Sequence, residues 1–412
     1  MDERTSQASG WALVAICFLA LGGSFSARSL LGLTMPLWES ELGWSRSFVS
    51  TGGALALVTM AIVAPIAGNL VDRIGVRPLL GGGLVMVALA MGLAGAASAE
   101  WQFLVAYSAL GGIGFGTVAN HVVSTAIALR FTAGRGLATG IAVSGSTAGQ
   151  LVVIPLLAAV MTSLGWRLSY ASLGLFALAL APVVLILLGS RSRASAGWAR
   201  DPGAAVEPLS RRLGALGRSW VFHALFWSYV VCGFTTTGVI ETHLLPYAAA
   251  CGFPPLESAT AYGVLSAFNL GGMVLSGFLT DRVNRSILLG TIYILRGLSF
   301  ILLGAVVGDL SLLFLFAVAF GLVDYATVPP TASLVASHIG LRVMDLTMGL
   351  LSAGHALGGA AGAFAGGVLF DLFATYDWVW TASTLLAISA GLLAYTIREA
   401  GGSLRPAAVA AR

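Results

Sequence analysis

Long apolar stretches separated by short polar breaks follow one another along almost the whole chain. A helix needs on the order of 20 apolar residues to cross a hydrocarbon layer of about 30 Å, and each stretch reaches roughly that length. The pattern therefore predicts a membrane protein with twelve spanning helices. The predicted spans cover residues 11–38, 48–70, 78–98, 103–129, 136–162, 167–189, 220–248, 258–279, 286–307, 310–336, 345–371 and 377–398.

A polar segment between the second and third spans has a diverged copy between the eighth and ninth. The first reads GNLVDRIGVR over residues 68–77 and the second reads GFLTDRVNR over 277–285, so about half of the 412 residues separates the copies. A repeat at this spacing indicates a helix bundle duplicated head to tail, as in many transporters. We therefore predict an all-α membrane protein with two six-helix pseudo-repeats, residues 1–189 and 220–412, joined by a cytoplasmic linker over 190–219.

The composition excludes a soluble globular protein. Hydrophobic residues make up 58% of the chain, charged residues make up 9%, and the mean hydropathy is +0.92. Soluble domains carry roughly 25% charged residues, so this chain must be solvated by lipid. The 53 glycines suit close packing of helices in a bilayer.

Every one of the 21 basic residues is an arginine, and their distribution predicts the topology. If both termini are cytoplasmic, 17 arginines lie on the cytoplasmic side, Arg46 and Arg167 lie outside, and Arg28 and Arg296 lie within helices. This bias agrees with the positive-inside rule and predicts a multi-pass inner-membrane protein with both termini in the cytoplasm. The net charge of +4 then reflects membrane orientation, and we expect no nucleic-acid binding.

The linker and the cysteines indicate no chemistry. Residues 190–219 are rich in Pro, Gly, Ala and Arg, with a short surface helix expected around LSRRLGALGR. Cys17, Cys232 and Cys251 have neither paired nor metal-like spacing. We find no phosphate loop and no nucleophile with a base and an orienting group, so we predict no metal, no cofactor and no enzyme activity.

Arg28 is the first candidate for a binding residue. It lies about 17 residues into the first predicted span, where an arginine costs roughly 2.5 to 3.5 kcal/mol on insertion scales. One interpretation is that its side chain extends to the lipid headgroups. The other is that the guanidinium faces a central pathway and binds an anionic substrate, preferably a carboxylate, through its planar donors.

A second arginine and an aspartate lie at similar depth in neighbouring spans. Arg296 falls in the ninth span and Asp324 near the middle of the tenth, so we expect the two to pair and to reduce each other's desolvation cost. The pair is interpreted either as structural or gating, or as a proton-linked switch. Tyr325 follows directly, and Pro329 and Pro330 predict a bend that places this stretch beside a cavity.

The polar repeat resembles the signature of the major facilitator superfamily, G-x-L-x-D-R-x-G-x-R after the second helix. The resemblance implies gating loops that control how the two halves meet on the cytoplasmic side, with helices 1, 4, 7 and 10 lining the pathway. The gating residues of the first copy and their counterparts in the second are Gly68, Asp72, Arg73, Arg77, Asp281 and Arg282.

Within this superfamily, the chain resembles the monocarboxylate and oxalate transporter branch. GWA at residues 10–12 matches part of that branch's first-helix motif, and Arg28 falls where its animal members place an essential lysine. RGLATGIAVSGSTAG over 135–149 resembles the fourth-to-fifth-helix signature, although its glycines also suit helix packing. Val274 stands where the branch has an eighth-helix arginine that binds the substrate carboxylate, so the usual anion anchor is absent.

Other polar groups complete the predicted site. By the resemblance, His121, Glu241 and Asp324 rank highest because they lie on pathway helices. A histidine in an apolar helix is either a hydrogen-bonded packing residue or a proton carrier, and Glu241 either serves coupling or reaches external water. Besides Arg28, the predicted substrate-binding residues are Asn120, His121, Thr236, Asn269, Tyr325 and His355, and the predicted coupling or pairing residues are Asp324, Arg296 and Glu241.

The sequence thus predicts a secondary active transporter that moves a small organic anion across the inner membrane by alternating access. A monocarboxylate is the expected substrate and proton symport the expected coupling, in a monomer embedded in the lipid bilayer. The missing eighth-helix arginine leaves open a carrier or exchanger of a dicarboxylate or another small organic solute. A hypothesis of a different class is a membrane receptor that does not transport.

Overall fold

The computed structural model describes residues 3–130, 135–187, 209–340 and 343–399, and nearly all of them are helical. Twelve helical spans in this part of the chain are long and apolar enough to cross a membrane, which confirms the predicted fold class. Most of the predicted linker falls outside the described residues. The short helix expected at LSRRLGALGR is present as α9 (Leu209–Arg218).

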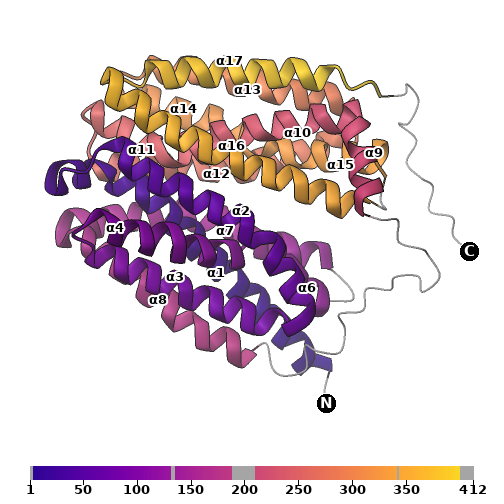
Figure 1. Cartoon of the computed structure of the whole chain (residues 1–412), viewed down its shortest axis with the longest axis horizontal. Helices are drawn as coiled ribbons and strands as arrows, with labels where there is room; N and C mark the ends of the chain where they lie inside the picture. Colours follow the sequence, from indigo (N-terminus) through magenta and orange to yellow (C-terminus); the bar gives the residue numbers. More distant parts are fainter. Residues whose placement is uncertain (1–2, 131–134, 188–208, 341–342, 400–412) are drawn as a thin grey trace, which may run out of the picture.

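The N-terminal half, by which we mean residues 3–187, contains six spans (Figure 1). All but the fourth are single helices, and the fourth is assembled from four shorter pieces. The elements are α1 (Glu3–Leu42), α2 (Arg46–Ile74), α3 (Val76–Ala96), α4 (Glu100–Phe103), the π-helical η1 (Leu104–Gly111), α5 (Gly112–Thr117), α6 (Asn120–Arg130), α7 (Arg135–Leu164) and α8 (Trp166–Leu187).

The C-terminal half, residues 209–399, begins with α9 and contains the other six spans. The seventh and tenth spans are the composite ones here. The elements after α9 are α10 (Trp220–Gly233), the π-helical η3 (Phe234–Ile240), α11 (Glu241–Ala250), α12 (Pro255–Thr280), α13 (Arg285–Gly304), α14 (Leu310–Val323), the 3₁₀ turn η4 (Tyr325–Thr327), α15 (Val328–His338), α16 (Met344–Phe373) and α17 (Asp377–Tyr395).

Irregular backbone is concentrated in the fourth, seventh and tenth spans. The fourth leaves the helical conformation at Val118, and the tenth is interrupted at Asp324. Pro329 and Pro330 lie in the first turn of α15, where their missing N–H groups cost nothing. The break in the tenth span falls before them, at Asp324, and not at the two prolines where the bend was expected. Irregular backbone at membrane depth is tolerated where protein surrounds it or where it lines a cavity. These three spans are therefore suited to build a site inside the bundle.

The segment expected to be a gating loop at residues 68–77 is largely helix. α2 continues to Ile74, so Gly68, Asp72 and Arg73 belong to its last turns. The connection to α3 is Gly75 alone, whose φ of 86° is a conformation that favours glycine. The helix α2 therefore continues until Gly75, where the chain turns into α3 in a conformation that glycine adopts without strain.

The second copy of this segment turns in a different way. α12 ends at Thr280, and Asp281 follows as its C-terminal cap. Asn284 is the counterpart of Gly75, and its side chain accepts a hydrogen bond from the Ile287 backbone N–H at 3.0 Å at the start of α13. A capping side chain therefore takes the place of the glycine turn.

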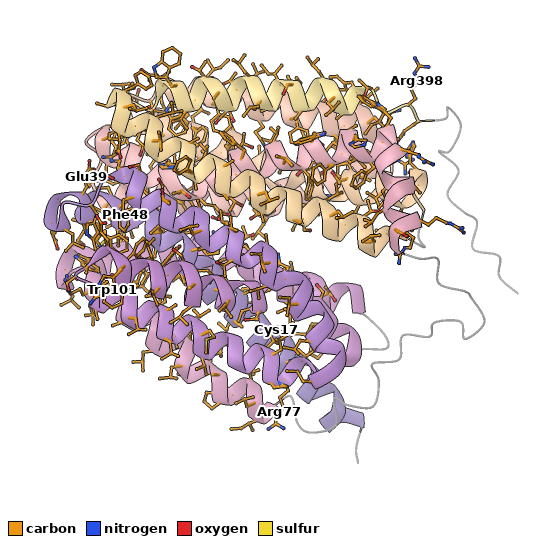
Figure 2. All side chains as sticks on the ribbon, in the orientation of Figure 1. Cys17, Glu39, Phe48, Arg77, Trp101 and Arg398 are labelled. Carbon is orange, nitrogen blue, oxygen red and sulfur yellow. The ribbon has the colours of Figure 1, made fainter. Side chains whose placement is uncertain are left out.

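The two halves lie against each other and pack mainly through α2 with α16, α7 with α12, and α1 with α11 (Figure 1). Figure 2 shows the two ends of the bundle. Glu39, Phe48 and Trp101 lie at one end, which we call the Glu39 end. Arg77, Arg398 and α9 lie at the opposite end, which we call the linker end. The predicted topology assigns the linker end to the cytoplasm.

Two glycines of the 135–149 signature pack α7 against α1. A methyl group at Gly149 would overlap the backbone of Gly22, and one at Gly145 would overlap the backbone of Phe18. Contacts this close require residues without a side chain, as in many membrane helix pairs. For these two positions the structure therefore supports the packing interpretation.

Candidate functional site

An ion pair between the two halves lies at the centre of the candidate site. Nη2 of Arg28 on α1 lies 2.6 Å from Oε2 of Glu241, the first residue of α11. The two side chains are 11% and 9% exposed. The Arg28 guanidinium also lies 4.8 Å from the Phe25 ring centroid. Arg28 therefore points into the bundle and does not extend to the headgroups.

Irregular helix geometry and a glycine position this pair. Glu241 follows directly on the π-helical η3, and such π-helical turns often occur at functional sites. Gly32 lies one turn after Arg28 on the same face of α1, and a Cβ there would lie 2.9 Å from the Thr242 carbonyl and 3.1 Å from that of Glu241. The missing side chain lets α1 approach α11 closely enough for the charges to meet.

Arg28 and Glu241 line a small pocket between the halves, with a volume of about 20 Å³, which is room for about one water molecule. Arg28 is the single positively charged residue among the described residues that line it. Hydroxyl groups also reach the pocket, and its apolar wall comes mostly from α1, α2 and α5. The hydroxyl residues are Tyr107, Thr237 and Thr242, and the wall includes Leu31, Leu57, Met60 and Phe115.

Tyr325 connects this pocket to a second polar cluster. Its hydroxyl donates to Oε1 of Glu241 at 3.4 Å, and its backbone N–H donates to the Asn269 side chain at 3.2 Å. Asn269 in turn donates to the Asp324 carboxylate at 3.1 Å, and the Thr236 hydroxyl donates to the same carboxylate at 2.6 Å. Four of the predicted residues therefore meet beside Glu241, within the C-terminal half.

Arg296 lies behind this cluster and contacts the broken tenth span. Its guanidinium donates to the carbonyl of Val323 at 3.0 Å and to that of Asp324. It also donates to the Cys232 thiol at 3.1 Å and to the Thr235 hydroxyl at 3.3 Å, while the Asp324 carboxylate lies 3.9 Å away. The guanidinium of Arg296 therefore lies closer to the two backbone carbonyls, the thiol and the hydroxyl than to the Asp324 carboxylate. The two carbonyls are ones that the helix break leaves without an intrahelical partner.

The remaining predicted site residues lie beside this cluster, elsewhere, or outside the described part. His355 on α16 is half-buried, packs against the Tyr229 ring at 5.6 Å between centroids and is hydrogen-bonded to the Cys232 thiol. Asn120 begins α6, and its side-chain oxygen is buried with no partner. The side chains outside the description are His121, Gly68, Asp72 and Arg73. Arg77 is half-buried and lies at the linker end (Figure 2). Asp281 and Arg282 are exposed.

Arg46 is a functional candidate that the sequence analysis assigned only to the outer side. The residue is 7% exposed and lies at the Glu39 end. It pairs with Glu39 at 2.7 Å, donates to the Tyr376 hydroxyl at 3.1 Å and stacks on the Phe370 ring at 3.7 Å. Tyr376 and Phe370 belong to the other half. An isolated arginine on the side that carries few of them was the signal in the sequence.

Tyr376 accepts the Arg46 hydrogen bond as a neutral phenol. Burial raises the pKa of Tyr376 to about 12, against the opposing influence of the nearby Arg46 charge. Beside this contact, the Ser47 backbone N–H donates to the Asp371 carboxylate at 2.9 Å. These contacts join α2 to the last turn of α16 and to Tyr376 in front of α17, so the two halves are held together at the Glu39 end.

A further contact between the halves joins α7 and α1 to α12. The Gln150 amide donates to the Ser29 hydroxyl at 2.8 Å and to the Tyr262 hydroxyl at 3.3 Å. The Ser29 and Tyr262 oxygens lie 3.1 Å apart. Sequence reasoning missed these residues because serine, glutamine and tyrosine are common in packed membrane helices.

A twelve-span bundle with a charged pocket between two halves is the architecture of a membrane transporter. The chain belongs to the Major Facilitator Superfamily, because the model of that family matches residues 17–344. The predicted family is thereby confirmed, and so is the prediction that the protein is a transporter and not an enzyme.

Named relatives cover most of the chain. The uncharacterized MFS-type transporter YcxA of Bacillus subtilis is 27% identical over 381 residues, which are 90% of each chain. Human monocarboxylate transporter 11 is 28% identical over 390 residues, 92% of this chain and 80% of that one. Monocarboxylate transporter 13 of Rattus norvegicus is 26% identical over 400 residues, 93% and 88% of the two chains.

Solved structures share the fold at low sequence identity. A bacterial homolog of the human lysosomal transporter Spinster, in an inward-facing and unoccupied conformation, matches with a TM-score of 0.72 and 16% identity over 96% of this chain and 97% of that one. The xylose transporter XylE from E. coli, in a partially occluded inward open conformation, matches with a TM-score of 0.71 and 16% identity over 94% and 98%.

Proposed function

We propose that this protein is a secondary active transporter that moves a small organic anion, most simply a monocarboxylate, across the inner membrane in symport with a proton. The observation that carries the proposal is the Arg28 guanidinium in the pocket between the halves. A guanidinium presents planar donors that match a carboxylate, and a buried site strengthens that contact.

The lining of the pocket favours one carboxylate over two. Arg28 supplies a single positive charge, and Glu241 beside it would repel a second carboxylate on the substrate. The wall formed by α1, α2 and α5 suits a short apolar group. Relatives named as monocarboxylate transporters support the same substrate class.

Alternating access follows from where the contacts between the halves lie. Arg46 and Ser47 join the halves at the Glu39 end, so these contacts must break for a substrate to pass there. The arginine distribution supports a topology in which the linker end and both termini are cytoplasmic. We infer that this conformation is closed toward the outside, as the inward-facing solved structures would suggest. One chain supplies the whole pocket, and we propose that it acts as a monomer.

The test is uptake into proteoliposomes of radiolabelled propionate, lactate, pyruvate and succinate. Hydrogen bonds to charged groups are worth about 1.5 to 3 kcal/mol, so Arg28→Ala should lower monocarboxylate uptake by roughly 10- to 100-fold. Arg28→Lys should retain part of the uptake because the charge remains and the planar fork is lost. Arg167→Ala, which removes an exposed arginine of α8, is the matched control and should transport as the wild type does.

Other outcomes separate the alternatives. Uptake of succinate with none of the three monocarboxylates would replace the proposal with a dicarboxylate carrier. Binding of a carboxylate without counterflow would favour the receptor hypothesis. Normal uptake by Arg28→Ala would exclude Arg28 as the anion-binding residue.

A further inference from the structure

The pocket offers one arginine to two acids. Arg28 is already paired with Glu241 at 2.6 Å, and the substrate carboxylate of the proposed function, on which this inference rests, needs the same donors. Two carboxylates with one guanidinium would leave a net negative charge in a largely buried pocket, which is costly because water cannot solvate it. One of the two acids must therefore lose its charge when both are present.

We propose that Glu241 carries the coupled proton, and that the substrate carboxylate replaces it at Arg28. When the substrate arrives, the Glu241 carboxylate takes one proton and releases the guanidinium, which then binds the substrate anion. When the substrate leaves, Glu241 gives up the proton and pairs with Arg28 again. One proton therefore moves with each monocarboxylate, and the cycle transfers no net charge.

The surroundings of Glu241 allow the exchange without large movement. The Tyr325 hydroxyl lies 3.4 Å from Oε1 of Glu241, so a neutral Glu241 can keep this hydrogen bond while its contact to Arg28 is broken. The titratable and charged groups that face or electrostatically influence Glu241 from α1, η1, α12, α14 and η4 are Arg28, Tyr107, Tyr262, Asp324 and Tyr325. Arg28 is the one cation among these groups, and it is the group that the substrate carboxylate would occupy.

Asp324 is the competing candidate, and its contacts make it less suited to this exchange. Its carboxylate accepts hydrogen bonds from Thr236 and Asn269 and lies 3.9 Å from Arg296. All of these partners belong to the C-terminal half, so they can stay in place when a substrate binds at Arg28. Glu241 is the acid whose partner comes from the opposite half and is needed by the substrate.

The experiment compares exchange with accumulation in proteoliposomes, using radiolabelled propionate, lactate and pyruvate as probes. Glu241→Gln mimics the protonated acid. It should keep counterflow at equal pH on both sides, and it should lose accumulation driven by a proton gradient, because it has no proton to exchange. Glu257→Gln, at an exposed acid in the first turn of α12, is the matched control and should accumulate the probes as the wild type does.

A second measurement needs no amide variant. Binding of a probe to the purified wild type in weakly buffered solution should take up about one proton per site, by linkage. Glu241→Asp keeps a titratable group and should retain gradient-driven accumulation.

Several results would overturn the assignment. They are full accumulation by Glu241→Gln, no proton uptake when a probe binds, or loss of accumulation with normal counterflow in Asp324→Asn but not in Glu241→Gln. A wild type that moves none of the probes would instead contradict the proposed function, and this assignment with it.

Discussion

Arg28 and Arg296 are both buried at membrane depth, but their partners come from different parts of the molecule. Arg28 on α1 pairs with Glu241 of the opposite half and lines the pocket. Arg296 on α13 is fully buried, and every one of its described partners belongs to its own half. A movement of one half against the other would break the first set of contacts and leave the second intact.

The comparison shows that burial alone does not make a membrane arginine a substrate-binding residue. Arg296 donates to the carbonyls of Val323 and Asp324 at a helix break, and such groups cannot find water inside a bilayer. Arg28 has one charged partner that a second anion can replace. The position of the partner, and not the depth of the charge, therefore separates the structural arginine from the functional one.

The largest expected effect tests the structural half of this comparison. Arg296→Leu leaves the Asp324 carboxylate without its counter-ion, and it leaves two backbone carbonyls and the Cys232 thiol without this donor. Removing one member of a buried charged contact costs about 3 to 5 kcal/mol in soluble proteins. We expect a strong loss of expression and of thermal stability in detergent, measured by the melting temperature. Arg28→Ala should lower the melting temperature less, because its pocket is partly open to solvent.

A double variant sharpens this prediction. If Arg296 mattered only as the charge partner of Asp324, adding Asp324→Asn to Arg296→Leu would restore stability almost fully. Because Arg296 also satisfies the carbonyls of the broken span, we expect the double variant to recover only part of the lost melting temperature. Complete recovery would reduce the role of Arg296 to that of a counter-ion. Additive losses would show that the two side chains do not interact.

A smaller effect is expected at the Glu39 end. Tyr376→Phe removes the acceptor of the Arg46 hydrogen bond, which is worth about 1 kcal/mol and hence about fivefold in the balance between closed and open states. A cysteine at the fully buried Ser50, in a Cys251→Ser background, should then react several-fold faster with a membrane-impermeant maleimide. Tyr395→Phe is the control, because it removes a tyrosine hydroxyl that contacts Thr291 within the C-terminal half and, among the described residues, makes no contact between the halves. Equal labelling rates in both variants would exclude Tyr376 from the closure.

Much of the fold could be predicted because lipid imposes simple rules on sequence. The lengths of the apolar stretches predicted the twelve spans. Pro329 and Pro330 predicted a bend in the tenth span, but the break falls before them, at Asp324. The segment at Asp72 was placed in a loop because it is polar, yet α2 continues through it to Ile74. Polarity predicts where a helix leaves the membrane, and it does not predict where the helix ends.

The site was harder to predict because its contacts join distant parts of the chain. Arg28 and Glu241 are separated by 213 residues, and no local pattern links them. The sequence left open whether Glu241 serves coupling or reaches external water, and the approach of α1 at Gly32 brings it to Arg28. Arg46 begins α2, and its position on the side with few arginines was the one signal in the sequence. Its burial comes from contacts with α16 and with Tyr376, which no local pattern predicts.

The most direct measurement of the central claim is carboxylate binding to purified protein, without transport. Wild type, Arg28→Ala and Arg167→Ala would be heated in detergent with increasing propionate, lactate or pyruvate, since a ligand that binds the folded state raises the melting temperature. We predict a concentration-dependent rise for the wild type and for Arg167→Ala, and none for Arg28→Ala. An equal rise for Arg28→Ala would show that the anion binds elsewhere and would contradict the account.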